Sequence, residues 1–85
     1  MTEQEIARQT LDYISELHGG GAGQFSLEAP LLEDGIIDSQ GLVDLITFLE
    51  KQFSIHIQDD DVNLENFTSV SSIASFVAAT RENHG

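Results

Sequence analysis

The sequence contains no cysteine and no tryptophan, one proline, and three basic residues against fifteen acidic ones. Without cysteine, the chain can form no disulfide framework and can supply no thiolate. No apolar run approaches the roughly 20 residues that span a bilayer, and the polar start at residues 1–5 does not resemble a secretory signal. We therefore expect a cytoplasmic protein that neither enters a membrane nor relies on disulfides.

The formal net charge of −12 argues against two classes of partner. Nucleic acids and anionic membrane surfaces would repel such a chain, whereas protein partners with basic patches would be steered toward it. Disorder is not expected, because apolar residues form 40% of the sequence and recur with a helical period. A chain of 85 residues predicts one domain over residues 1–85, and we expect a monomer.

Apolar periodicity predicts two long helices in the first two thirds of the chain. The first runs from about Glu3 to Leu17, begins with the capping-box spacing of Thr2 and Glu5, and ends at His18 and the glycines that follow. Its predicted buried face comprises Ile6, Thr10, Ile14 and Leu17, with Tyr13 beside it. The second begins near Asp38–Ser39 and ends near residue 53. Its apolar stripe comprises Leu42, Leu45, Ile46, Leu49 and Phe53.

The last third predicts a short and then a long helix. Alternation at residues 55–57 indicates a short extended piece with His56 facing solvent. Three aspartates at residues 59–61 suit the start of a one-turn helix that continues to Glu65. The final helix begins after Thr68 or Ser69, and Arg81 near its end suits the helix dipole. Its predicted buried stripe comprises Val70, Ile73, Phe76 and Val77.

Residues 19 to about 38 form a connection long enough to suggest a function of its own. We expect residues 19–24 to be mobile, and Pro30 excludes a regular helix through the middle. The second part should be pinned to the core by its apolar residues, which are Phe25, Leu27, Leu31, Leu32, Ile36 and Ile37. The expected fold is all-α, a small antiparallel four-helix bundle with three long helices, one short helix and a long first connection.

Ser39 is the principal candidate for a functional residue, because it follows Asp38 where the long connection becomes a helix. A serine there is solvent-exposed and lies beside backbone N–H groups that lack helical partners, so it can carry a phosphate ester. Asp38 suits the N-cap. Gly41 costs on the order of 1 kcal/mol of helix propensity relative to alanine and removes side-chain bulk near Ser39.

The segment Gly35-Ile36-Ile37-Asp38-Ser39 resembles the modification site of the acyl carrier protein family, and residues 63–73 resemble its short third helix and the start of its fourth. The resemblance implies that Ser39 bears 4′-phosphopantetheine, attached from coenzyme A by a phosphopantetheinyl transferase. The chain would then hold an acyl or aminoacyl cargo as a thioester and would not be an enzyme. An adenylating ligase or acyltransferase would load it for downstream biosynthetic enzymes. The order Ser-x-Gly looks closest to free-standing carriers, including D-alanyl carrier proteins.

The resemblance also implies a docking face on the second helix, where Asp44 and Glu50 would meet arginine or lysine of the partners. The residues of this face are Gln40, Val43, Asp44, Thr47 and Glu50. Gln40 departs from the leucine or methionine of many family members, and this leaves the identity of the modifying enzyme open. An ordinary solvated face is the alternative, because exposed ion pairs are individually weak. Phe48 could line a cargo channel but is expected to join the core.

Other chemistries fit the sequence poorly. An EF-hand loop starting at Asp59 would need glycine where Leu64 stands and glutamate where Val70 stands. The three histidines are too scattered for a metal site, and a serine-hydrolase elbow fails because Ile37 occupies the position of its first glycine. The remaining alternative to a modified carrier is an unmodified acidic interaction module or a degenerate carrier.

Overall fold

The computed structural model describes residues 2–17 and 26–84, with side chains to residue 82. These residues contain three long α-helices, α1 (Glu3–Leu17), α2 (Ser39–Phe53) and α4 (Val70–His84), and one short one, α3 (Leu64–Phe67). A 3-10 turn, η1 (Asp59–Asp61), precedes α3. The all-α fold with three long helices and one short helix is thereby confirmed. Expectations for residues 18–25, which include the glycine cap and Phe25, lie outside the described residues.

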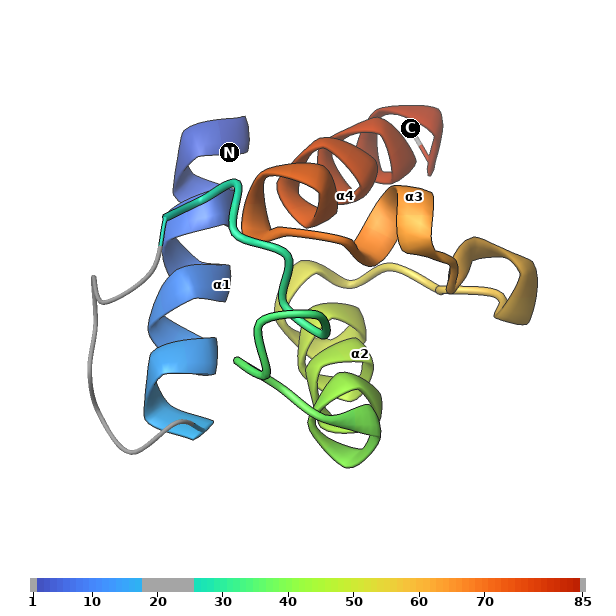
Figure 1. The fold of residues 1–85 in the computed structure, drawn as a ribbon. Helices are drawn as coiled ribbons and strands as arrows, with labels where there is room; N and C mark the ends of the chain where they lie inside the picture. The colour runs from blue at the N-terminus through green and yellow to red at the C-terminus, as the bar shows by residue number, and fades with distance from the viewer. Residues whose placement is uncertain (1, 18–25, 85) are drawn as a thin grey trace.

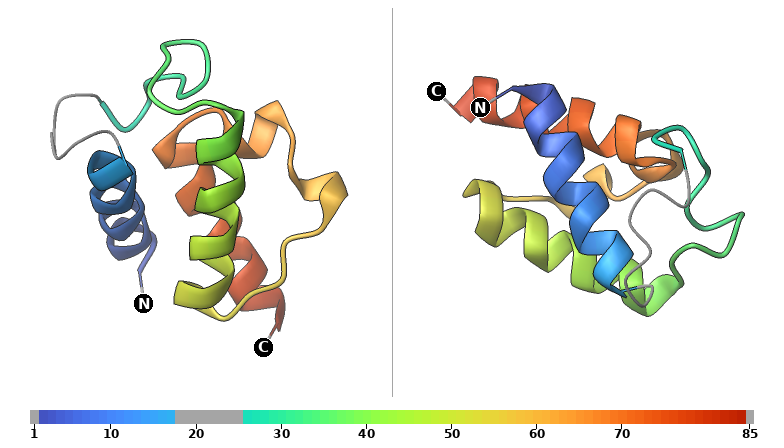
Figure 2. Two further views of the ribbon diagram at one scale, coloured as in Figure 1. Left: turned by 90° about the horizontal axis from the view of Figure 1, so that it is seen from below. Right: turned by 90° about the vertical axis from the view of Figure 1, so that its left-hand side faces the viewer.

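The three long helices enclose the core (Figure 1). Figure 2 shows that α1 runs against α2 and α4, whereas α2 and α4 point in the same general direction. The connection after α2 carries the chain back toward the other end of that helix, and the short α3 then leads into α4 (Figure 2). Among the described helices, none combines the length and the apolar character needed to cross a membrane.

The core largely follows the predicted stripes. The buried members of these stripes are Ile6, Thr10, Ile14, Leu45, Leu49, Phe53, Val70, Ile73 and Val77. Leu42, Ile46 and Phe76 are only half-buried, although they pack against the core. Phe48 packs against this core as expected, stacked on Tyr13 with ring centroids 4.2 Å apart. The prediction for Leu17 is wrong, because this last residue of α1 is 44% exposed. It lines a groove next to α2, and no other helix among residues 2–17 and 26–84 covers it.

The second part of the long connection is pinned to the core, as predicted, and is also hydrogen-bonded near the start of α4. Leu31 is fully buried and its N–H donates to the Thr68 carbonyl at 2.8 Å. The Ser71 N–H in the first turn of α4 donates to the Leu27 carbonyl at 2.9 Å. The side chains of Leu27 and Leu32 are more exposed than expected, at 39% and 38%. The backbone contacts therefore fix this segment as much as its apolar side chains do.

Residues 55–67 differ from the prediction in detail. Ile55 and Ile57 are buried with His56 exposed between them, so the alternation is confirmed without a strand. The single predicted helix from residue 59 to 65 is wrong, because η1 ends at Asp61 and α3 begins separately at Leu64. Two caps cause the break. The Asp61 carboxylate accepts from the Gln58 N–H, and the Asn63 side chain accepts from the Asn66 N–H, so each starts its own turn.

Arg81 has a different partner from the one expected. Its Nη1 donates to the carbonyl of Phe53 at 2.7 Å, so the guanidinium caps the C-terminus of α2 rather than that of its own helix α4. The chain leaves α2 through Ser54, whose left-handed backbone (φ 54) turns the chain so that the Ile55 N–H, like that of Ser54, donates to the Glu50 carbonyl. The C-terminal end of α2 is therefore fixed by both local and long-range contacts.

Candidate functional site

The candidate site is the N-terminus of α2. Asp38 is the N-cap, and its Oδ1 accepts from the Gly41 N–H at 2.7 Å. Ser39 is the first helical residue and is exposed. Because a helix offers its first N–H groups no internal acceptor, those of Ser39 and Gln40 remain available beside the serine hydroxyl. The predicted helix start and cap are confirmed.

Gly41 allows the cap to fold tightly over the helix end. A Cβ at this position would lie 3.2 Å from the Ile37 Cβ and 3.3 Å from the Asp38 carboxylate oxygen. A larger residue would therefore push against the connection that enters α2 and against the cap itself. We expected the missing side chain of Gly41 to leave space near Ser39. In the structure, the space that it leaves lies toward Ile37 and Asp38.

Most of the predicted docking residues share an exposed surface with Ser39. Gln40, Val43, Asp44 and Thr47 are all exposed, and Val43 retains 56% of its accessible surface. Gln40 Nε2 donates to Asp44 Oδ1 at 3.3 Å, one turn further along the helix. Their spacing of four residues is the signal from which this contact could have been predicted.

Glu50 is placed differently from the other four. It is half-buried, and its Oε2 accepts from the Ile57 N–H at 2.9 Å. The same oxygen lies 3.6 Å from His56 Nδ1. Glu50 thus holds the chain that follows α2, and its carboxylate is only partly available to a partner.

Two grooves flank α2 near Ser39. The groove toward α1 has a volume of about 330 Å³ and is lined by Leu17, residues 35–38, Gln40, Gly41 and Asp44. The groove toward α3 is smaller, about 230 Å³, and largely apolar, with lining residues Leu32, Leu42, Val62, Asn63, Leu64 and Phe67. Ser39 itself lines neither groove, whereas its neighbours Asp38 and Gln40 line the first one.

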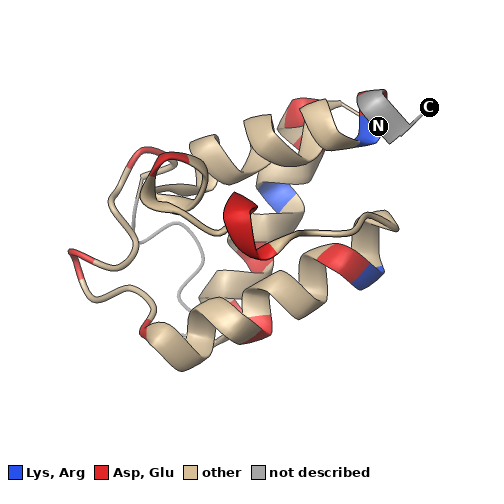
Figure 3. Ribbon diagram, turned by 90° about the vertical axis from the view of Figure 1, so that its right-hand side faces the viewer, with Lys and Arg blue, Asp and Glu red and all other residues tan. Residues whose placement is uncertain are grey.

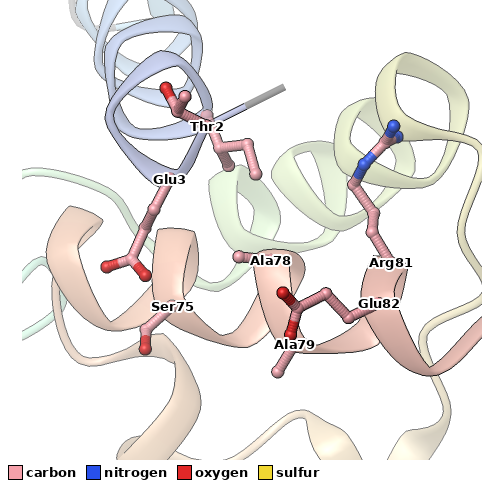
Figure 4. A pocket seen from close by; sticks show the side chains of 8 residues that line it. Thr2, Glu3, Ser75, Ala78, Ala79, Arg81 and Glu82 are labelled. Atoms are coloured by element: carbon pink, nitrogen blue, oxygen red, sulfur yellow. The ribbon is translucent and has the colours of Figure 1, made fainter.

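A larger groove of about 580 Å³ lies elsewhere, between the start of α1 and α4. Figure 4 shows Glu3 from α1 and Ser75, Ala79 and Glu82 from α4 around it, with the Arg81 side chain extending away toward α2. The small side chains of α4 create this hollow. Its lining holds the hydroxyls of Thr2 and Ser75 and the carboxylates of Glu3 and Glu82. Among the described side chains, no hydrogen bond pairs one of these hydroxyls with a carboxylate.

Charge is distributed unevenly around the candidate site. Figure 3 shows acidic positions over several elements and few basic ones. The three basic residues are Arg8 on α1, Lys51 in the last turn of α2 and Arg81 on α4.

Tyr13 contacts α2 close to the candidate site, where its hydroxyl donates to the Asp44 carbonyl at 3.2 Å. Burial, and secondarily the Asp44 carboxylate, raises the pKa of Tyr13.

The geometry fits attachment of a phosphopantetheine arm to Ser39. The serine is exposed, a groove opens on either side of its helix, and Asp38 directs one carboxylate oxygen at the Gly41 N–H. Neighbouring N–H groups and the helix dipole favour an anion there.

The acidic η1 has a structural role, since the Asp61 carboxylate caps it. No group of three or more potential metal ligands occurs within residues 2–17 and 26–84.

The sequence is similar to those of known carrier proteins. It is 34% identical over 76 residues to the acyl carrier protein of Thermotoga maritima, a match that covers 89% of this chain and 91% of the relative. It is 33% identical over 55 residues to the D-alanyl carrier protein of Lacticaseibacillus casei, over 65% and 68% of the two chains. No family model matches the sequence.

Solved structures agree with the sequence relatives. The peptidyl carrier protein domain described as KstB-PCP(apo) matches with a TM-score of 0.71 and 30% identity, over 92% of this chain and 88% of that one. A chain in a crystal structure of an FAD-dependent dehydrogenase matches with a TM-score of 0.70 and 31% identity, over 79% and 96%. The protein therefore belongs to the acyl carrier protein family, whose members are carriers rather than enzymes.

Proposed function

We propose that Ser39 carries 4′-phosphopantetheine and that the chain, as a single carrier domain, presents an acyl or aminoacyl cargo to separate biosynthetic enzymes. The observation that supports this most directly is the exposed serine at the first position of α2, directly after the Asp38 cap. When bound, the arm supplies a terminal thiol that holds the cargo as a thioester. The chain itself lacks cysteine, so that thiol must come from the arm.

Attachment is a group transfer to the Ser39 hydroxyl. Oγ attacks the pyrophosphate phosphorus that bears the pantetheine, a P–O bond forms, and the P–O bond to the departing adenosine 3′,5′-bisphosphate breaks. A base of the transferase takes the serine proton. Asp38 holds the first turn in place, while the N–H groups of Ser39 and Gln40 favour the resulting phosphodiester anion.

Intact-mass spectrometry after incubation with coenzyme A and a broad-specificity phosphopantetheinyl transferase tests this function. The wild type should gain one phosphopantetheinyl group, and Ser39→Ala should gain none. Ser75→Ala, which changes an exposed serine on α4, is the matched control and should be modified fully. An unmodified wild type with several competent transferases would indicate a degenerate carrier or an unmodified interaction module.

We also propose that the exposed face of α2 is the docking surface for the transferase and the loading enzyme. Four of its five predicted residues are exposed beside Ser39, and the net charge of −12 favours basic partners. Loading should slow as salt rises, because screening weakens exposed charges. Asp44→Lys should slow loading more than Glu50→Lys, since Glu50 is half-buried. If both variants load at the wild-type rate in low salt, this face is not the docking surface.

The Glu50→Lys variant needs a structural control. Its carboxylate accepts from the Ile57 N–H, so substitution disturbs the chain after α2 as well as the surface charge. Glu50→Gln keeps an oxygen acceptor and removes only the charge. A slow Glu50→Lys variant with a normal Glu50→Gln variant would assign the effect to local structure or to the new positive charge.

A further inference from the structure

The turn that carries the chain toward α2 contains the pair Asp34–Gly35, and residues 32–35 are all exposed. The Gly35 N–H donates to the Leu32 carbonyl at 3.1 Å. The Ile36 N–H donates to the Leu31 carbonyl at 2.9 Å. Together with the left-handed backbone of Gly35 (φ 70), these two bonds form the Schellman arrangement that commonly ends a helix. The path of the chain here therefore depends on hydrogen bonds that close across Asp34.

Glycine is the residue that this turn requires. Other residues rarely adopt a positive φ, because their Cβ crowds the backbone. A Cβ at Gly35 would have no atom of the described residues within 4 Å, its chain neighbours aside. The backbone conformation, and not a lack of space, thus selects glycine. The same glycine leaves its own backbone nitrogen without a side chain to shield it.

Asp34 differs from the aspartates that act as caps. The Asp38 carboxylate accepts from the Gly41 N–H, and the Asp61 carboxylate accepts from the Gln58 N–H. Among the described residues, the Asp34 carboxylate has neither such a bond nor an ion pair. In the sequence, it is the single aspartate or asparagine that precedes a glycine. Its side chain is therefore free to turn toward the next backbone nitrogen.

We infer that Asp34–Gly35 is a site of spontaneous isomerisation, at which the aspartyl linkage is slowly converted to an isoaspartyl linkage. The Gly35 nitrogen attacks the carboxyl carbon of protonated Asp34 and a C–N bond forms. The C–O bond to the carboxyl hydroxyl breaks, and this group leaves with the amide proton as water. Water then opens the cyclic imide at either carbonyl, which gives aspartate again or gives isoaspartate. Water is released and consumed in equal amounts, so the mass of the chain is unchanged.

The closed turn slows this reaction, because the Gly35 nitrogen must leave its bond to the Leu32 carbonyl before it can attack. Exposed surface segments open locally at a lower free energy than the core does. Leu31, by contrast, is fully buried, and its N–H donates to the Thr68 carbonyl at 2.8 Å. The turn can therefore open while the residues before it stay in place, and the reaction proceeds from the folded protein.

An isoaspartyl linkage would release the turn. It routes the main chain through the side-chain carbons of residue 34 and so lengthens the chain at that point. The hydrogen bonds donated by Gly35, Ile36 and Ile37 all close across this link, and their geometry depends on its length. These residues directly precede the Asp38 cap. Isomerisation would thus loosen the path by which the chain enters α2.

Ageing of the chain without an arm tests the inference. The folded wild type is kept at neutral pH and physiological temperature for several weeks. Isoaspartate is measured by methyl transfer from S-adenosylmethionine with an isoaspartyl carboxyl methyltransferase, and tandem mass spectrometry of the peptides locates it. We expect it to accumulate at residue 34 of the wild type. Asp34→Glu should gain none there, because glutamate must close a larger ring. Asp12→Glu, which changes an exposed aspartate before Tyr13, is the matched control and should age like the wild type.

Hydrogen exchange tests the structural consequence. The isoaspartyl form is separated by ion-exchange chromatography and compared with fresh protein. The amides of Gly35, Ile36 and Ile37 should exchange faster, and those of α4 should be unchanged. A wild type that gains no more isoaspartate at residue 34 than Asp34→Glu does would overturn the inference, as would an isoaspartyl form with unchanged exchange at residues 35–37. No step needs an arm on Ser39, so the result is independent of the proposed function.

Discussion

The two ends of α2 differ in how they are held. At the C-terminal end, Phe53 is 1% exposed, its carbonyl accepts from Arg81 at 2.7 Å, and the Glu50 carboxylate binds the following Ile57 N–H. At the N-terminal end, Ser39 is exposed and the cap is a local one from Asp38. The same helix is thus anchored in the core at one end and exposed to solvent at the other, which we call the presented end. This arrangement suits the proposal that Ser39 enters the active site of a transferase.

The largest expected effect comes from the anchored part. Leu49 is fully buried, so Leu49→Ala should lower the free energy of unfolding by about 2–5 kcal/mol through lost apolar burial and a residual cavity. Val43, in the same helix, is 56% exposed, so Val43→Ala should change stability by well under about 1 kcal/mol. Chemical denaturation measures both, and equal losses would show that α2 is not anchored as described.

Arg81 provides the next largest test. Arg81→Met removes the donor to the Phe53 carbonyl and should cost about 1 kcal/mol, because the bond is only partly buried. Lys51→Met removes the same charge from the last turn of α2 without breaking that bond. Thermal melts of the two variants separate the hydrogen bond from the general loss of positive charge. A Lys51 variant as unstable as the Arg81 variant would assign the effect to net charge alone.

The smallest effect concerns Tyr13, whose hydroxyl donates to the Asp44 carbonyl near the presented end of α2. Burial and Asp44 raise its pKa above the usual 10.0, so the unfolded chain loses this proton at a lower pH than the folded one. The contribution of Tyr13 should be complete below pH 10 and should fall as pH rises through the raised pKa. The stability of Tyr13→Phe lacks this term, so the difference between wild type and variant should shrink above pH 10. A difference that stays constant across that range would contradict the assignment.

The presented end was largely predictable from sequence, because its determinants are local. Asp38 followed by Ser39 and then by an apolar stripe specifies where a helix starts, whatever the rest of the fold does. The i,i+4 contact between Gln40 and Asp44 was equally accessible, although it was not predicted. By contrast, the contact of Arg81 with Phe53 joins residues 28 positions apart, and no local pattern specifies it.

Other differences have similar causes. Leu17 continues the apolar face of α1, but its burial depends on whether another element covers that position. Among the described residues none does, and Leu17 instead lines the groove beside α2. The break between η1 and α3 depends on two competing caps, from Asp61 and Asn63, which helix propensity alone does not resolve. The Glu50 carboxylate accepts from the Ile57 N–H because the chain turns back after α2, and no local pattern specifies that turn.

Site mapping after arm transfer tests the central claim most directly, because α2 is flanked by an exposed serine at each end, Ser39 and Ser54. The modified wild-type protein is digested and its peptides are sequenced by tandem mass spectrometry. We predict a single phosphopantetheinyl group on the peptide that contains Ser39, localised to that residue, with Ser54 unmodified. Modification at Ser54 or at any other serine, with Ser39 unmodified, would contradict the account.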